Sequence, residues 1–157
     1  ALEAAALAEK GMSGAEIKEY LDTQVVPKVE ASFVIDTLKY LHKGGRCSSV
    51  AALGANLLKL KPCIEVQNGL MHVGKKYRGA IEKCIGEYVT NRLQGRDDIN
   101  YKRIFITHTD CPSAVIEAAK QAIQQYGQFE EILETKAGCT ISNHCGPGTL
   151  GVLFIRK

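Results

Sequence analysis

Near the C-terminal end of the sequence, eight residues combine several groups that could do chemistry. Residues 142–149 read SNHCGPGT and contain an imidazole at His144, a thiol at Cys145 and two hydroxyls. His144 and Cys145 could form a nucleophilic pair, because a histidine can hold a cysteine as its reactive thiolate. Such pairs are normally assembled from segments that lie far apart in the sequence, so adjacency weighs against this interpretation.

The same stretch also offers ligands for a metal ion. Cys139, His144 and Cys145 carry suitable side chains, and His108 and Cys111 precede them in the sequence. Structural zinc sites are usually marked by closely spaced pairs such as Cys-x-x-Cys. No Cys-x-x-Cys pair occurs, and adjacent His144 and Cys145 are awkward ligands for one tetrahedral ion. The spacing of these candidate ligands therefore weighs against a metal site.

A third possibility is that the stretch binds an anion. Gly146 and Gly148 allow the backbone to approach a ligand closely, and Pro147 fixes the turn between them. Backbone N–H groups, the two hydroxyls and the imidazole of His144 could then hold a carboxylate or a phosphate. The residues alone leave open a simpler alternative, in which Gly-Pro-Gly is only a tight turn before the last strand.

Two arginines are placed where a helix is expected to begin. Arg46 follows Gly44-Gly45, and Arg78 precedes Gly79. An arginine at a helix N-terminus opposes the macrodipole, so it does not serve helix stability there. It adds positive potential where backbone N–H groups already favour an anion. Arg46 and Arg78 are therefore further candidates for an anion site, with an ordinary surface role as the alternative.

The elements that must position these residues are helices and strands in mixed order. Asn68-Gly69 lies between two apolar runs, which is typical of a type I′ hairpin turn. Ser13 is a candidate N-cap, and Pro27 is expected to end the helix that follows it. The pattern predicts helices over 2–10, 13–26, 37–43, 48–58, 79–93 and 113–126, and strands over 32–35, 62–67, 70–73, 102–107, 129–133 and 149–155. This order predicts an α+β fold, with a mixed, partly antiparallel sheet and packed helices.

Length and composition narrow the class of protein. The 157 residues suit a single domain over 1–157. The net charge of +3 is small, and no basic run carries interleaved aromatic residues, so nucleic acid is not an expected partner. No apolar run approaches the length needed to span a bilayer. The six cysteines show no paired spacing and no secretory signal is present, so we expect free thiols in a soluble, cytoplasmic protein.

Five segments, taken in order, resemble the C-terminal half of DegV family proteins. They are GGRCSSV (44–50), LLKLKPCIEVQNGLM (57–71), KYRG (76–79), ITHTDCPSAVIEAA (106–119) and SNHCGPGTLGVLF (142–154). Gly-Pro-Gly alone would mean little, but this ordered set is specific and covers nearly the whole chain. The family includes the fatty-acid-binding subunits of bacterial fatty acid kinase.

The resemblance implies a protein of two α/β domains with a fatty acid buried between them. It implies that His144 hydrogen-bonds the carboxylate, within the loop that contains Gly146 and Gly148, and that Arg78 lies near the head group. Arg46 is then expected to face the kinase partner or the transferred phosphate. By the same resemblance the protein is not itself an enzyme, because a separate ATP-dependent kinase phosphorylates the bound carboxylate. The family's N-terminal domain has no counterpart in this chain.

The ligand that we expect is a long-chain fatty acid, and no cofactor is expected. The energetics of burying a carboxylate and an acyl chain agree with this ligand. A carboxylate beside apolar walls must be paired and hydrogen-bonded, and charge-assisted bonds from His144 and Arg78 would meet that need. Each buried CH₂ contributes about 0.8 kcal/mol, so the acyl chain would supply most of the affinity. Two other functions stay open. One is a cysteine-dependent hydrolase or acyltransferase using Cys145 with His144, and the other is a regulatory or assembly module without a ligand.

Overall fold

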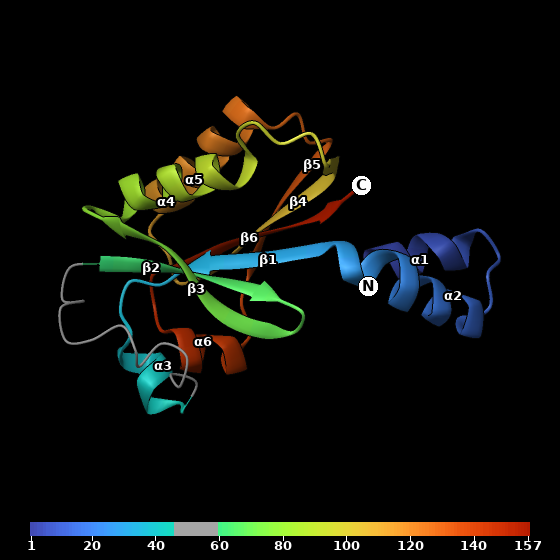
Figure 1. Cartoon of the computed structure of the whole chain (residues 1–157), viewed down its shortest axis with the longest axis horizontal. Coiled ribbons are helices and arrows are strands. Elements are labelled where there is room, and N and C mark those ends of the chain that lie inside the picture. The colour runs from blue at the N-terminus through green and yellow to red at the C-terminus, as the bar shows by residue number, and fades with distance from the viewer. Residues whose placement is uncertain (46–59) are drawn as a thin grey trace.

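The computed structural model describes residues 1–45 and 60–157 of the chain. Within them, six strands form one mixed sheet in the order β3-β2-β1-β6-β4-β5 (Figure 1). Strands β4 and β5 are parallel, and the other neighbouring strands are antiparallel. The strands are β1 (Val29–Val34), β2 (Leu60–Gln67), β3 (Leu70–Arg78), β4 (Ile99–Thr109), β5 (Glu131–Lys136) and β6 (Thr149–Arg156). The predicted α+β class with a mixed sheet is confirmed.

Helices cover both faces of the sheet. They are α1 (Leu2–Glu9), α2 (Gly14–Tyr20), α3 (Lys39–Lys43), α4 (Ile81–Leu93), α5 (Ser113–Tyr126) and α6 (Cys139–Cys145). Figure 1 shows α4 and α5 on one face, α3 and α6 on the opposite face, and α1 and α2 beyond one end of the sheet. A π-helical turn, Leu21–Val25, and a 3-10 turn, Val26–Lys28, connect α2 to β1. The predicted helix over 48–58 lies outside the described residues.

Two local signals in the sequence are confirmed. Ser13 caps α2, because its Oγ accepts a hydrogen bond from the N–H of Glu16 at 3.4 Å and its own N–H donates to the Glu16 carboxylate at 2.8 Å. Asn68 and Gly69 both have positive φ, at 52° and 76°, as a type I′ turn requires. Both signals act over a few neighbouring residues, so they can be recognised without the tertiary structure.

Several predicted strand boundaries are wrong because pairing with a neighbouring strand decides where a strand ends. Strand β1 begins at Val29, where it already pairs with β6, and β3 continues to Arg78 because it pairs with the start of β2. The fifth strand covers Glu131–Lys136, not 129–133. Phe129 lies before it in the core, with its ring centroid 5.0 Å from that of Tyr101.

No helix was predicted where the structure has α6, Cys139–Cys145. Residues 142–145 form the end of α6, and only Gly146, Pro147 and Gly148 form the turn before β6. Helix α6 is held by contacts with distant residues. Cys145 belongs to a small buried cluster that also contains Ile35, Leu41 and Ile64.

The larger part of the apolar core lies between the sheet and helices α4 and α5, and Tyr88 of α4 is fully buried within it. The Tyr88 hydroxyl donates to the carbonyl oxygen of Ser32 at 2.7 Å and accepts from the N–H of Val152 at 3.1 Å. It also lies 2.7 Å from Oγ of Ser32, which must be the donor because the tyrosine proton is already used. Tyr88 therefore links α4 to β1 and β6, and burial raises the pKa of its phenol.

We expect Tyr88→Phe to lower the free energy of unfolding by about 2 kcal/mol. Each buried hydrogen bond contributes roughly 1 kcal/mol net, and the groups left unpaired on Ser32 and Val152 add a further cost. Urea denaturation measures the difference. Tyr20→Phe is the control, because Tyr20 is 44% exposed. A loss for Tyr88→Phe no greater than that of the control would contradict this role.

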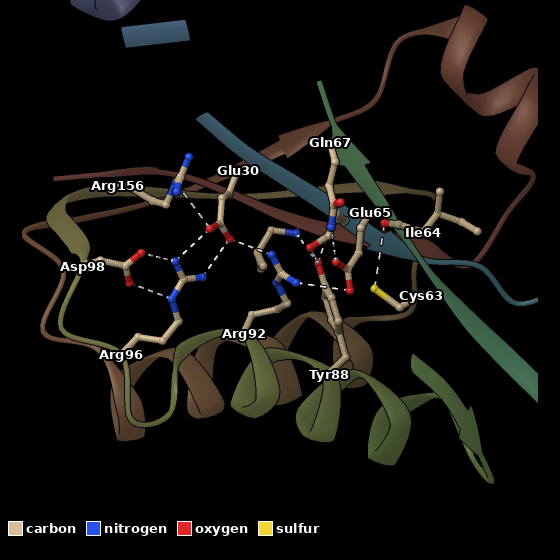
Figure 2. A network of polar contacts seen from close by, with 12 residues as sticks. Glu30, Cys63, Ile64, Glu65, Gln67, Tyr88, Arg92, Arg96, Asp98 and Arg156 are labelled. Atoms are coloured by element: carbon tan, nitrogen blue, oxygen red, sulfur yellow. Dashed lines mark hydrogen bonds and ion pairs between the residues drawn. The ribbon is translucent and has the colours of Figure 1, made fainter. Parts of the chain in front are cut away.

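A half-buried network of charges joins β1, β2 and β6 to the end of α4 (Figure 2). Glu30 lies at its centre and accepts hydrogen bonds from Arg92 at 2.6 Å and from Arg96 at 2.8 Å. The outer members are Glu65, 3.3 Å from Arg92, Asp98, 2.6 Å from Arg96, and Arg156, 3.7 Å from Glu30. Arginines and carboxylates are equal in number within this network, so it is electrically balanced.

Candidate functional site

His144 lies in the last turn of α6, directly before the turn of Gly146, Pro147 and Gly148. The helix ends there because Gly146 has φ 79° and ψ 174°, a backbone conformation that essentially only glycine adopts. Gly148 also has a positive φ, 74°, and β6 begins at the next residue. The segment is therefore a helix end and a turn of fixed shape, which together place His144 near the start of β6.

Two glycines bring α3 and α6 into direct contact. The imidazole of His144 lies against Gly44, immediately after α3, where an added Cβ would overlap Nδ1 and lie 2.9 Å from Cε1. The ring of Tyr40, in α3, lies against Gly146, where an added Cβ would lie 2.6 Å from Cε2 of the tyrosine. Gly44 of the Gly-Gly-Arg motif and His144 of the His-x-Gly-Pro-Gly motif are thus in contact, although they lie far apart in the sequence.

The imidazole of His144 has an unused hydrogen-bonding atom. Its Nδ1 is buried, and no donor or acceptor among residues 1–45 and 60–157 pairs with it. An unpaired buried polar group costs about 1–3 kcal/mol, and such groups are uncommon in folded proteins. A partner from outside the described residues, either a ligand or another segment, would remove this cost. Two other buried nitrogens are unpaired among the described residues, Nε of Arg92 and Nε2 of His108, but both side chains lie beside carboxylates, so Nδ1 of His144 is the atom that marks a candidate binding site.

The backbone N–H groups of the Gly-Pro-Gly turn are already paired. Gly146 donates to the carbonyl oxygen of Ser142 at 2.8 Å, and Gly148 donates to that of Thr109 at 2.9 Å. The N–H of Thr149 donates to Oγ1 of Thr109 at 3.1 Å. Pro147 has no N–H group. Gly146 and Gly148 therefore shape the turn, and an anion at this place depends on side-chain donors such as His144.

Cys145 does not have the properties of a nucleophile. The side chain is only 5% exposed, and burial raises the pKa of its thiol, which favours the unreactive protonated form. Cys145 follows His144 on a helix, and neighbouring helical residues point in directions about 100° apart. These observations weigh against the cysteine-dependent hydrolase.

The other candidate metal ligands lie elsewhere. His108 is buried on the opposite face of the sheet, with Nε2 3.4 Å from a carboxylate oxygen of Glu134, and Cys111 packs against the larger core. Among the residues that the structure describes, no group of three or more His, Cys, Asp and Glu side chains is arranged to hold a metal ion. None of the described helices has the length and apolar content needed to cross a bilayer.

Arg78 is the last residue of β3 and is exposed. Tyr77 packs into the core beneath α4, so the next residue along the strand projects on the side of α3 and α6. Arg78 pairs with Leu60, at the end of the sheet where β6 begins. It therefore shares a face and a sheet end with His144, although three strand spacings, about 14 Å, separate β3 from β6. Arg46 lies outside the described residues.

A row of apolar side chains crosses the whole sheet on the same face as His144. Strand register places its members next to one another: Leu133, Phe105, Leu153, Ala31, Val66 and Met71. All six are half-buried, whereas the opposite face carries the closed core. We call these six residues the apolar row. Five strand spacings give it a length of about 24 Å. The sequence shows the alternation along each strand, but the register that aligns the row appears only in the structure.

Comparison with protein-family models matches residues 1–157 to the family described as uncharacterised protein, DegV family. The chain belongs to the DegV family. Among curated DegV relatives, a protein of Thermotoga maritima named fatty acid-binding protein is 30% identical over 144 residues, covering 91% of this chain and 49% of its own length. The chain spans about half the length of the curated relatives it matches.

Solved structures show the same DegV fold. A Thermus thermophilus structure, described as fatty acid binding of a DegV family protein, has a TM-score of 0.81 at 27% identity and covers 99% of this chain and 55% of its own. The Streptococcus pneumoniae fatty acid kinase (Fak) B3 protein, loaded with linoleic acid, has a TM-score of 0.78 at 18% identity, covering 96% and 52%. The second likeness concerns the fold alone.

Proposed function

We propose that this chain forms one side of a fatty-acid site, with the apolar row against the acyl chain and His144 bonded to the carboxylate. The unpaired, buried Nδ1 of His144 carries this proposal, because it marks a polar end beside an apolar sheet face. The names of the Thermotoga and Thermus relatives support the same class of ligand. In the whole protein, the remaining half of the length would close over the ligand at an interdomain cleft.

The apolar row suits an acyl chain in both length and exposure. Its residues are half-buried in this chain, so a ligand or a covering segment would remove further apolar surface from water. Each buried CH₂ contributes about 0.8 kcal/mol, which makes a long acyl chain the main source of affinity. The head-group end would then set orientation and keep the carboxylate ionised through charge-assisted hydrogen bonds.

The proposed role is that of a carrier that presents its fatty acid to a separate kinase. A carboxylate oxygen would attack the γ-phosphorus of ATP on the kinase, giving an acyl phosphate and ADP. Arg78 would lie near the head group, because it shares a face and a sheet end with His144. Arg46, which lies outside the described residues, would face the kinase or the transferred phosphate, as the family resemblance implies. The pneumococcal fatty acid kinase (Fak) B3 protein shares the fold of this chain, and its name supports a kinase as the class of partner.

We expect His144→Ala, in the full-length protein, to weaken fatty acid binding and phosphorylation by at least about tenfold. A charge-assisted hydrogen bond is worth about 1.5–3 kcal/mol, which corresponds to this factor or more. Lipid extraction with native mass spectrometry gives the bound fatty acid per chain, and turnover with the kinase gives the rate. His72→Ala is the matched control, because His72 is exposed on β3 and pairs with Glu65, which faces α4.

Two results would overturn the proposal. Full-length wild-type protein that carries no fatty acid, and takes up none from a panel, would remove the lipid function and favour a regulatory or assembly module. Equal binding and turnover for His144→Ala and His72→Ala would remove His144 from the site. A Cys145 thiol that reacts with iodoacetamide much faster than the other cysteines would favour the hydrolase instead.

A further inference from the structure

Thr109 holds the Gly-Pro-Gly turn with its side chain. It is the last residue of β4, is 5% exposed, and lies opposite Thr149 in β6. Its Oγ1 donates to the carbonyl oxygen of Gly146 at 2.5 Å and accepts from the N–H of Thr149 at 3.1 Å. One hydroxyl therefore bridges the two ends of the turn. A hydroxyl is suited to this position because it both donates and accepts.

The Thr109 hydroxyl pairs two buried backbone groups of the turn, the carbonyl oxygen of Gly146 and the N–H of Thr149. Gly146 has a conformation that is open to glycine but not to other residues, so the path of the chain at this point is narrowly defined. The residue after Thr109, Asp110, also has a positive φ, 44°, so the end of β4 is a second constrained point. Oγ1 of Thr149 adds one more bond, to the carbonyl oxygen of Cys145 at 3.1 Å. Without the Thr109 hydroxyl, the Gly146 carbonyl and the Thr149 N–H lose a buried partner.

We propose that Thr109 is a positioning residue that sets the orientation of His144 through the Gly146 carbonyl and the start of β6. Its part in ligand binding rests on the proposed fatty-acid function. His144 is two residues from the carbonyl that Thr109 holds, and the imidazole is confined on its other side by Gly44. A small rotation of the last turn of α6 would change the direction of the imidazole on the face of the sheet that carries the apolar row. Thr109 touches no ligand in this scheme, so its effect is transmitted through the turn.

The test compares three variants of the full-length protein. Thr109→Val keeps the shape and removes both side-chain bonds, Thr109→Ser keeps the hydroxyl, and Ser32→Ala removes another buried hydroxyl. Ser32 is 3% exposed and bonds to Tyr88 on the opposite face of the sheet. We expect Thr109→Val and Ser32→Ala to lower the melting temperature by comparable amounts. Only Thr109→Val should weaken fatty acid affinity, by about tenfold, and Thr109→Ser should restore it.

Two readouts do not depend on lipid. Hydrogen exchange at the Thr149 amide should speed up at least about tenfold in Thr109→Val but not in Ser32→Ala. The NMR chemical shifts of the His144 imidazole at a fixed pH should change in Thr109→Val and return to the wild-type values in Thr109→Ser. Unchanged hydrogen exchange and unchanged imidazole chemical shifts in Thr109→Val would overturn the proposal, as would equal affinity losses for Thr109→Val and Ser32→Ala. If wild-type protein binds no fatty acid, the proposed function fails, and these two readouts still decide the role of Thr109.

Discussion

Replacing Gly146 with alanine is expected to lower the free energy of unfolding by about 3 kcal/mol. The backbone conformation at φ 79° and ψ 174° costs a non-glycine residue roughly 1–3 kcal/mol. The new methyl group would also overlap the ring of Tyr40, and overpacking of this kind typically costs about 1–3 kcal/mol. Chemical denaturation measures the loss. Because the displaced ring belongs to α3, the contact between α3 and α6 should open together with the turn.

A second glycine, Gly95, serves as a control that separates the two costs of Gly146→Ala, backbone strain and overlap with the Tyr40 ring. Gly95 has a similar φ, 72°, but an added Cβ there meets nothing within 4 Å. Gly95→Ala should therefore cost only the strain, about 1 kcal/mol. Adding Tyr40→Ala to Gly146→Ala should recover part of the loss by removing the overlapping ring. Equal losses for the two single variants, or no recovery in the double variant, would show that Tyr40 does not confine the turn.

Replacing Glu30 with glutamine is expected to lower the free energy of unfolding at pH 7 by roughly 2 kcal/mol. Breaking a fully buried ion pair costs about 3–5 kcal/mol, and Glu30 is 19% exposed, so the smaller figure applies. The variant leaves the guanidinium groups of Arg92 and Arg96 facing a neutral amide. Asp98→Asn is the control, because Asp98 is 44% exposed and bonds to Arg96 at the rim of the network. Its loss should stay near 0.5 kcal/mol.

The same carboxylate makes stability depend on pH in a defined direction. Burial alone would raise the pKa of Glu30, but hydrogen bonds from Arg96 and the charges of Arg92 and Arg96 outweigh it and hold the pKa below the ordinary value of 4.5. The stabilisation is therefore complete above the unfolded-state pKa and is lost as pH falls through the folded-state pKa. As the pH is lowered from 7 to 2, the difference in the free energy of unfolding between wild type and Glu30→Gln should therefore shrink. A constant difference down to pH 2 would rule out ionisation of Glu30 as its source.

The sequence predicted the elements whose signals are local. The Asn68-Gly69 hairpin and the Ser13 cap depend on a few adjacent residues, so their conformations were predictable. Helix α6 was not, because CTISNHC contains Thr, Ser and Asn, which are weak helix formers. This helix forms where Cys145 joins Ile35 and Leu41 in a buried cluster, and these contacts are distant in the sequence.

The candidate site could likewise be predicted from the sequence only in part. His144 and the turn glycines could be singled out from their residue types, and Arg78 from its place before a helix. The contacts that confine His144 could not, because Gly44, Tyr40 and Thr109 come from segments that only the fold brings together. Glu30 was missed because β1 was expected to start at residue 32. The apolar row requires the register of all six strands, which alternation within single strands does not specify.

The central place of β1 has a consequence for the order in which the chain folds. On one side β1 pairs with the β2–β3 hairpin, and on the other with β6, which is joined to β4 and β5. Its partners in β6 are more than 100 positions away in sequence, as in the pair Val34 and Leu150. Closing so long a loop costs entropy before the pairing yields any gain, and such topologies fold slowly. The hairpin and the β4–β5–β6 unit can form first, so the joining of β1 to β6 is the step expected to limit the folding rate.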